Sequence, residues 1–146
     1  MAHVELSWTE APAAMPRIPE WNTVDRWAAT VDGANEACMV IDKLGRVAAV
    51  STPACRLLGF STPEAARGQS LFAGAIALRD FTSDGAALSQ DEVLRIPPVV
   101  VLTSGLLARG VLRARVGKDT VTMDAVSTPL RERDQVIGSL TFFSVV

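Results

Sequence analysis

The stretch Met39–Phe60, MVIDKLGRVAAVSTPACRLLGF, decides the fold of this 146-residue chain. It begins within an apolar run, Cys38–Ile41, that stops at Asp42. Gly45 follows and supplies the positive φ that a tight hairpin loop needs. A second short apolar segment, Arg46–Val50, comes directly after the glycine. The pattern therefore predicts two strands joined by a hairpin turn.

The remainder of the same stretch predicts a short helix. Thr52 is placed to cap this helix, and Pro53 occupies its first position, where the missing N–H costs nothing. Gly59 is expected to end the helix because glycine readily adopts the left-handed conformation, and Phe60 can fold back on the last turn.

This order of strand, turn, strand and short helix resembles the opening of a PAS domain. The usual run of that family is an apolar strand ending in Asp, a turn with Gly, a second strand, then Asn-Pro-Ala-Ala, an apolar pair and Gly-Tyr/Phe. Thr52 stands where the family most often has Asn, and Cys55 stands where it has a small residue. The matching residues are Asp42, Gly45, Pro53, Ala54, Leu57, Leu58, Gly59 and Phe60.

The C-terminal third carries a second block of the same resemblance. Segments 111–116, 120–128 and 136–145 predict three strands, and Pro129 is expected at a strand end because it cannot donate to a central ladder. PAS domains commonly close with a strand leading to Pro-Leu, a charged turn, Val-Ile-Gly and an apolar strand, although Gln135 replaces the usual glycine of that turn. The matching residues are Pro129, Leu130, Asp134, Val136, Ile137 and Gly138.

The resemblance covers about residues 22–146 and implies an α+β fold. That fold is a five-stranded antiparallel sheet with helices packed on one face and an N-terminal amphipathic helix. We expect a single PAS-like domain at 22–146, preceded by an extended, proline-containing arm at 1–21. The chain begins with Met and carries no recognisable effector pattern, so we expect a free-standing PAS module of bacterial type, or one excised from a longer protein.

Three segments between the two blocks predict further helices. One helix is expected at 70–79, and Ser89 with Glu92 resembles a capping box for another. The segment 99–108 is ambiguous, because its valines favour a strand whereas the long helix of the family at this place favours a helix. We predict a helix there.

The N-terminal part of the domain predicts an amphipathic helix at 22–36, capped by Asn22. Its apolar residues recur at three- and four-residue spacing, and one sheet can cover only part of such a stripe. We therefore predict a homodimer with this helix at the interface; the alternative is that the helix folds over its own sheet. The predicted interface residues are Trp21, Val24, Trp27 and Val31.

The composition excludes several classes of protein. The hydrophobic content is 49%, which suits one globular domain, and a net charge of −2 argues against a nucleic-acid binder. Cys38 and Cys55 both fall in apolar segments and are expected to be reduced core residues. No signal-peptide pattern and no apolar run long enough to span a membrane occurs, so we expect no membrane association and a cytoplasmic location.

No cofactor is expected, neither haem nor flavin. A haem-binding PAS domain usually offers a histidine on its long helix, but the only histidine is His3, in the N-terminal arm. The run around Cys55 echoes the flavin-binding LOV subfamily, but it falls in a different helix, and the flavin-holding Asn and Gln set of that subfamily is missing. One histidine and two separate cysteines also provide no zinc site.

Three charged residues in the C-terminal strands are the remaining candidates for chemistry. Arg113 and Arg115 share one strand face, which is either a solvent- or partner-facing stripe or an inward clamp for a carboxylate ligand. Asp124 is expected to face outwards and to pair with one of these arginines. The sequence contains no nucleophile–base pattern of a hydrolase, so we expect no enzymatic activity.

Two functions remain open. The first is a sensory or signalling module that acts by protein–protein contact, as a homodimer or by docking to a signalling partner. The second is a sensor for an apolar ligand such as a fatty acid, bound between the sheet and the helices. The residues predicted to line that pocket are Phe72, Leu78, Val101, Leu106, Met123 and Phe142.

Overall fold

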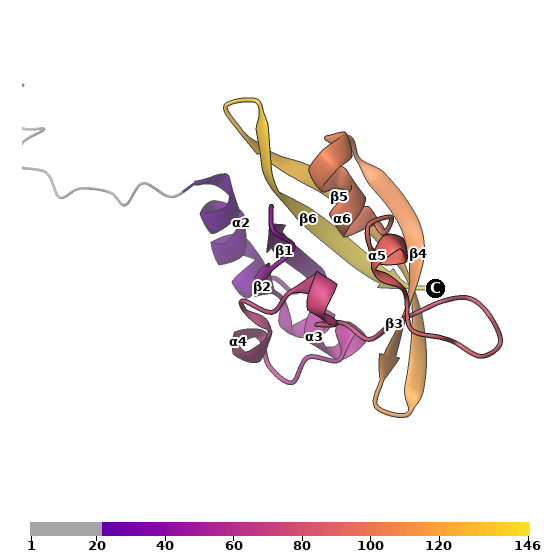
Figure 1. Ribbon diagram of the computed structural model, residues 1–146. Coiled ribbons are helices and arrows are strands. Elements are labelled where there is room, and N and C mark those ends of the chain that lie inside the picture. Colours follow the sequence, from indigo (N-terminus) through magenta and orange to yellow (C-terminus); the bar gives the residue numbers. More distant parts are fainter. Residues whose placement is uncertain (1–21) are drawn as a thin grey trace, which may run out of the picture.

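The computed structural model describes residues 22–146, which form an α+β domain (Figure 1). The predicted arm at 1–21, together with His3 and Trp21, lies outside the described residues. An antiparallel sheet of six strands, in the order β2-β1-β6-β5-β4-β3, is the centre of the domain, so the predicted fold class is confirmed with one strand more than expected. The additional strand is the two-residue β3.

The helices and strands have the following bounds. The helices are α2 (Thr23–Asp32), α3 (Thr52–Leu58), α4 (Pro63–Ala66), α5 (Gln90–Val93) and α6 (Pro97–Ser104), with a 3₁₀ turn, η1, at Leu71–Ala73. The strands are β1 (Cys38–Asp42), β2 (Val47–Val50), β3 (Leu78–Arg79), β4 (Ala108–Val116), β5 (Asp119–Glu132) and β6 (Gln135–Val145).

The predicted hairpin between β1 and β2 is confirmed. Asp42 holds its turn, because its Oδ1 accepts hydrogen bonds from the backbone N–H of Leu44 at 2.9 Å and of Arg46 at 3.0 Å. Gly45 has a φ of 78°, and a Cβ at this position would lie 2.5 Å from the Phe72 ring. Glycine is therefore required here by both conformation and space.

The N-cap of helix α3 lies one residue earlier than predicted. Ser51, not Thr52, is the N-cap, since the Ser51 Oγ accepts from the backbone N–H of Ala54 at 3.3 Å. Ser51 is extended at the end of β2, as an N-cap residue must be, whereas Thr52 is already helical. Gly59 ends the helix with a φ of 87°, as predicted.

The predicted helix at 70–79 is wrong. Only the turn η1 forms, and Gly74, with a φ of 80°, stops it. Leu78 and Arg79 then join the edge of the sheet, where they pair with Ala114 and Arg113 of β4. The left-handed backbone conformation of Gly74, in the middle of the segment, prevents the helix from continuing.

The ambiguous segment 99–108 is a helix over its first half only. Helix α6 starts at Pro97, because proline is well suited to the first helical position, and ends at Gly105, which has a φ of 67°. Ala108 is already the first residue of β4. The helix prediction is thus confirmed up to Ser104, and wrong beyond it.

Pro129 lies within β5 and not at its end. It pairs with Ser139 of β6, while β4 begins opposite Ser127 and reaches no further along β5. From Thr128 onward, β5 therefore has no neighbouring strand on the side of β4. A proline, which lacks an N–H, breaks no hydrogen bond of the sheet on this side. A proline is tolerated inside β5 only because β4 ends before it, and the sequence did not show how far β4 extends.

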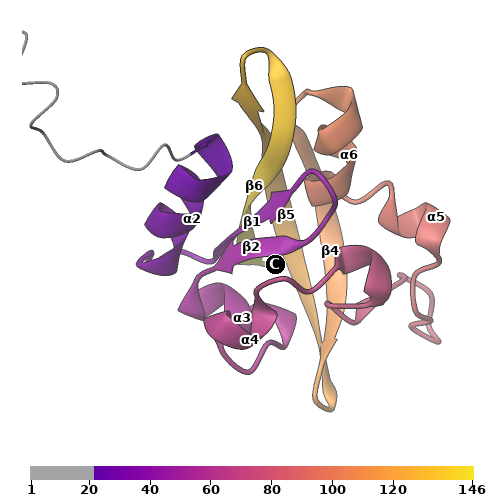
Figure 2. The same ribbon diagram turned by 60° about the vertical axis from the view of Figure 1, so that its left-hand side comes forward.

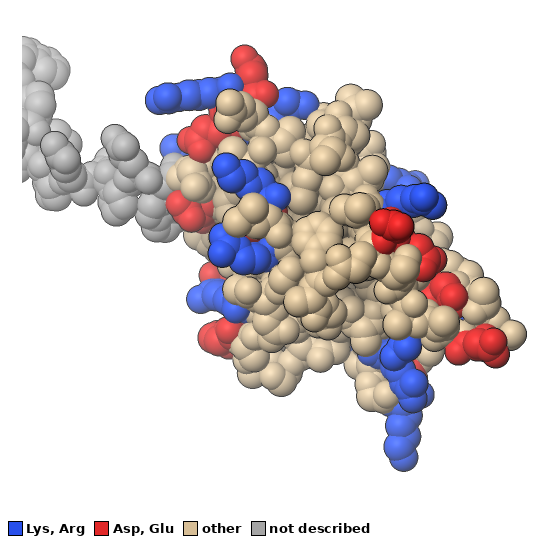
Figure 3. Space-filling view, viewed as in Figure 1, with Lys and Arg blue, Asp and Glu red and all other residues tan. Residues whose placement is uncertain are grey.

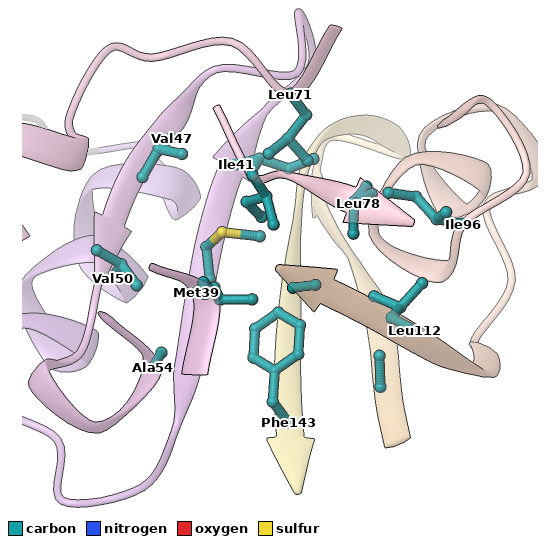
Figure 4. Packing of buried hydrophobic residues seen from close by; sticks show 14 of the residues in the cluster. Met39, Ile41, Val47, Val50, Ala54, Leu71, Leu78, Ile96, Leu112 and Phe143 are labelled. Carbon is teal, nitrogen blue, oxygen red and sulfur yellow. The ribbon is translucent and has the colours of Figure 1, made fainter. Parts of the chain in front are cut away.

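The two faces of the sheet carry different helices. We call the face covered by α3 to α6 the inner face and the face covered by α2 the outer face; Figure 2 shows α2 and α6 on opposite sides of the sheet. The inner face holds the larger core, in which Met39, Ile41 and Phe143 converge with side chains from the helices (Figure 4). The outer face holds a smaller core beneath α2.

Asn22 caps helix α2 as predicted, and the cap is a capping box, in which the Asn22 side chain accepts from the backbone N–H of Asp25 and the Asp25 carboxylate accepts from that of Asn22. Among residues 22–146, no helix is both long and apolar enough to cross a bilayer.

Candidate functional site

Helix α2 leaves part of the outer face uncovered. Its buried residues pack over β1, β6 and the far end of β5. Beyond the helix, Val111 lies opposite Asp124, and Val126 lies opposite Phe142, so these four side chains share the outer face. Val111 is 48% exposed and Phe142 is 45% exposed, which leaves apolar surface in contact with water.

Trp27 extends this apolar surface from the helix. Asp32 lies on the side of α2 towards Arg67, with which it pairs at 2.7 Å. Thr23 lies on the other side, one turn before Trp27, and its Oγ1 donates to the backbone O of Arg131 in β5 at 3.0 Å. Trp27 therefore faces the β5 side and is 39% exposed. We call the set Trp27, Val111, Val126 and Phe142 the outer patch.

The predicted dimer stripe is divided by this arrangement. Val24 and Val31 are buried against the sheet of their own chain, as in the alternative considered for this helix. Trp27 alone among the described residues of the stripe keeps a large exposed area, because it lies at the edge of the buried face. The prediction that Val24 and Val31 contact a second copy is therefore wrong, because both are buried within their own chain. Their place is taken by strand residues, of which Phe142 was predicted for the ligand pocket.

Charged residues beside the outer patch form one ion pair. Arg109 of β4 donates to both carboxylate oxygens of Asp124, with the shortest contact 2.7 Å. Asp124 thus faces outwards and is paired, as predicted, but its partner is Arg109 and not Arg113 or Arg115. The predicted pairing is wrong because Arg109, diagonally across the strand pair from Asp124, reaches its carboxylate.

Arg113 and Arg115 do not form an inward clamp. Arg113 donates to the backbone O of Asp80 at 3.2 Å, and its guanidinium lies 5.6 Å from the centre of the Phe81 ring. Arg115 donates to the backbone O of Gly117 at 3.4 Å. Both residues alternate with the buried Leu112 and Ala114, so they belong to the outer side of β4.

Of the six residues predicted to line an apolar pocket, Leu78 and Met123 belong to the inner core and Phe72 packs against it, whereas Leu106 and Phe142 lie elsewhere. Leu78, Val101 and Met123 are buried in side-chain packing, and Leu106 is exposed after the end of α6. Phe142 lies on the outer face because its neighbour Phe143 takes the inward position. Phe72 and Leu78 border a hollow of about 210 Å³ between η1, α5 and β3. The register of β6, which decides between the two phenylalanines, was not available from the sequence.

Both cysteines are buried and free, and burial raises the pKa of each thiol. Cys38 lies beneath α2 and Cys55 lies in the inner core, so neither thiol meets solvent in the folded protein. We expect a thiol reagent such as DTNB to label the native protein about 100-fold or more slowly than the unfolded chain, the factor set by an opening free energy of about 3 kcal/mol. Rapid labelling of one thiol without denaturant would show that its element opens locally.

The described residues show no metal-binding cluster. Within 22–146, no cluster of three or more His, Cys, Asp or Glu side chains is arranged to hold a metal ion. Acidic and basic side chains both occur on the face that carries α5 and α6, mostly towards its periphery (Figure 3). The outer patch is a surface feature that can carry a function by contact.

No protein-family model and no curated protein matches the sequence. Solved structures do match. The PAS domain of an HTR-like protein from Haloarcula marismortui gives a TM-score of 0.56 at 12% identity, over 100% of both chains. The PAS domain of a protein from Colwellia psychrerythraea gives 0.58 at 17% identity, over 83% of this chain and 94% of that chain. The Vibrio cholerae VqmA dimer gives 0.60 at 12% identity, over 83% of this chain and 50% of VqmA.

Proposed function

We propose that this chain, which has the PAS fold, is a non-enzymatic sensory or signalling module that acts by contact between two copies of itself. The similarity to solved structures establishes the fold alone, so the mode of action rests on the surface of this chain. The observation that carries it is the outer patch, an exposed apolar area that continues from α2 onto the sheet.

The outer patch has the chemistry of a protein interface. An aromatic side chain on the helix and another on the sheet, Trp27 and Phe142, are the residue types that anchor interfaces. Each such side chain gains roughly 1.5–3 kcal/mol between full exposure and full burial, and a half-exposed one gains correspondingly less. In a two-fold dimer every contact counts twice, which helps to offset the roughly 4–15 kcal/mol that association costs.

Charge supports a second copy as the occupant. Arg109 and Asp124 lie side by side at the border of the outer patch. A two-fold axis through the outer patch would bring each arginine close to the aspartate of the other copy, so the same surface is complementary to itself. The VqmA protein, half of which is similar to this chain, is described as a dimer, and this agrees with the proposal.

Sedimentation velocity at micromolar concentration tests the proposal. We expect the wild-type protein to sediment as a dimer and the Phe142→Glu variant as a monomer, because a carboxylate buried without a partner would weaken the dimer by about 3 kcal/mol or more, a factor of ~100. Trp27→Glu should act in the same direction. Leu44→Glu is the control, since Leu44 is exposed in the β1–β2 turn, away from the outer patch.

A different partner for the outer patch would give a different sedimentation result. If residues 1–21 cover the outer patch within one chain, the wild type remains a monomer and Phe142→Glu lowers its thermal stability without changing its mass. A wild type that is monomeric throughout the concentration range contradicts the proposal, whatever the variants do. Circular dichroism of each variant confirms that a change of mass is not a loss of the fold.

A further inference from the structure

Strand β4 has a free edge over half of its length. On the side away from β5, β3 pairs with it only at Arg113 and Ala114, and no described residue pairs with Ala108–Leu112 there. The backbone N–H of Arg115 donates to Ala77 on this side, and the groups that point to one side alternate along an antiparallel strand. The N–H and C=O groups of Val111 and Arg109 therefore point to the free edge, ready to pair with another strand.

The free edge borders a hollow of about 330 Å³ between β4 and the helices α5 and α6. The side of the hollow towards the helices is mainly apolar. It is formed by Leu88, Ile96, Pro97, Val100 and Leu112.

Four arginines surround the same hollow, against one acidic residue, Glu92. They are Arg79, Arg95, Arg109 and Arg113. Arg79 lies directly opposite Arg113 on adjacent strands, an arrangement of like charges that destabilises a sheet unless an anion lies between them.

Arg79 supplies a second, independent sign that a partner is missing. Its Nε is buried and has no hydrogen-bond partner among the described residues. No carboxylate within 22–146 lies at ion-pair distance from Arg79, Arg95 or Arg113, whereas Arg109 has Asp124. A buried donor without an acceptor is costly and calls for an explanation.

We propose that the free edge of β4 binds an extended segment of a partner protein in which acidic and apolar residues alternate. The segment adds to the sheet as a strand, so that its backbone pairs with Val111 and Arg109. Alternate side chains then point to opposite faces. One set meets the guanidinium groups of Arg79 and Arg113 and is acidic, and the other set meets the apolar side of the hollow.

This site adjoins the proposed dimer contact, because Val111 and Arg109 belong to both. It uses the backbone edge of β4 and the hollow beside it, whereas the dimer uses side chains that point out from the outer face. A small organic anion or phosphate satisfies the arginines but leaves the strand edge unpaired. The edge and the charge together therefore favour an acidic strand over a small ligand.

The test uses the full chain and short synthetic peptides, followed by backbone amide NMR. The probe peptide alternates Glu and Val; one control peptide has Lys in place of each Glu, and another has Pro at its centre. We expect the Glu–Val peptide to shift the amide signals of Val111 and Arg109 and to slow their hydrogen exchange. The two control peptides should leave both signals unchanged.

Variants of the protein provide the second part of the test. Replacement of Arg79 and Arg113 together by Gln is expected to weaken binding of the Glu–Val peptide by about 10-fold or more, the loss of one to two charge-assisted contacts. Arg56→Gln is the matched control, because Arg56 is an exposed arginine of α3 that does not line the hollow. The sedimentation of these variants should equal that of the wild type, so a failure here is distinguishable from a failure of the dimer.

Four results would overturn the proposal. They are no peptide binding, equal binding of the Lys–Val peptide, binding of glutamate or phosphate alone with no slowed exchange at Val111, and exchange at Val111 that is already slow in the free protein. The last result would mean that the edge is occupied by residues 1–21 or by a second copy.

Discussion

Replacement of Gly138 by alanine is expected to lower the free energy of unfolding by about 3 kcal/mol, near the upper end of what overpacking usually costs. A Cβ at this position would lie 2.5 Å from the carbonyl O of Ile41 and 2.8 Å from a methyl carbon of Val24. The carbonyl belongs to β1, which pairs with β6 at this point, so it cannot move without breaking the ladder. Urea denaturation followed by circular dichroism measures the change.

Gly33→Ala is the matched control for this prediction. No heavy atom lies within 4 Å of a Cβ at Gly33, and its φ of −101° is accessible to alanine. We expect its effect to stay within about 0.5 kcal/mol, as for ordinary surface substitutions. Equal losses in the two variants would show that the close approach of α2 and β1 to Gly138 is not what requires the glycine.

Ser51→Ala is the second substitution with a large expected effect, a loss of about 3 kcal/mol. The Ser51 Oγ accepts from the backbone N–H of Cys38 at 3.0 Å and of Ala54 at 3.3 Å, and it donates to the carbonyl O of Glu36 at 2.6 Å. Loss of a helix N-cap costs about 1 kcal/mol, and each buried group left unpaired adds about 1–3 kcal/mol. One hydroxyl thus joins the start of β1 to the start of α3.

Thr62→Ala provides the comparison, because Thr62 is also an N-cap but is exposed and makes only the capping bond to the backbone N–H of Ala65. Its loss should be about 1 kcal/mol. Thermal or urea unfolding of both variants gives the difference, which we expect to be about 2 kcal/mol. A difference near zero would contradict the role of Ser51 as a link between two elements.

The sequence predicted the strands and turns at the two ends of the domain because their signals are local. Asp42 and Gly45 define a turn by their own chemistry, and the glycine at position 59 ends a helix wherever it stands. The middle of the chain was less predictable. Gly74 ended the helix expected at 70–79, and the place of Leu78 in the sheet depends on a pairing with Ala114 that no local pattern contains.

The candidate site was predicted only in part, for the same reason. The helical spacing identified Trp27, but it did not distinguish the buried Val24 from a residue at an interface, since both lie on one stripe. In β6, Phe142 and Phe143 are adjacent, and only the register against β1 and β5 decides which one faces the core.

The packing of the inner face bears on the choice between contact and an apolar ligand. Met123 and Val101, two of the residues predicted to line an apolar pocket, are fully buried, and this supports the proposed contact function over the apolar-ligand alternative. The outer patch, by contrast, is an apolar surface that extends from α2 onto the sheet and is partly exposed. The proposed contact function thus rests on the exposed apolar side chains of the outer patch.

Native mass spectrometry of the purified protein tests the proposed contact between two copies, because one spectrum reports both the number of chains and any bound mass. We predict a species made of two chains of 15.5 kDa each, with no additional mass from haem, flavin or lipid. A single chain that carries the mass of a bound small molecule would contradict the account.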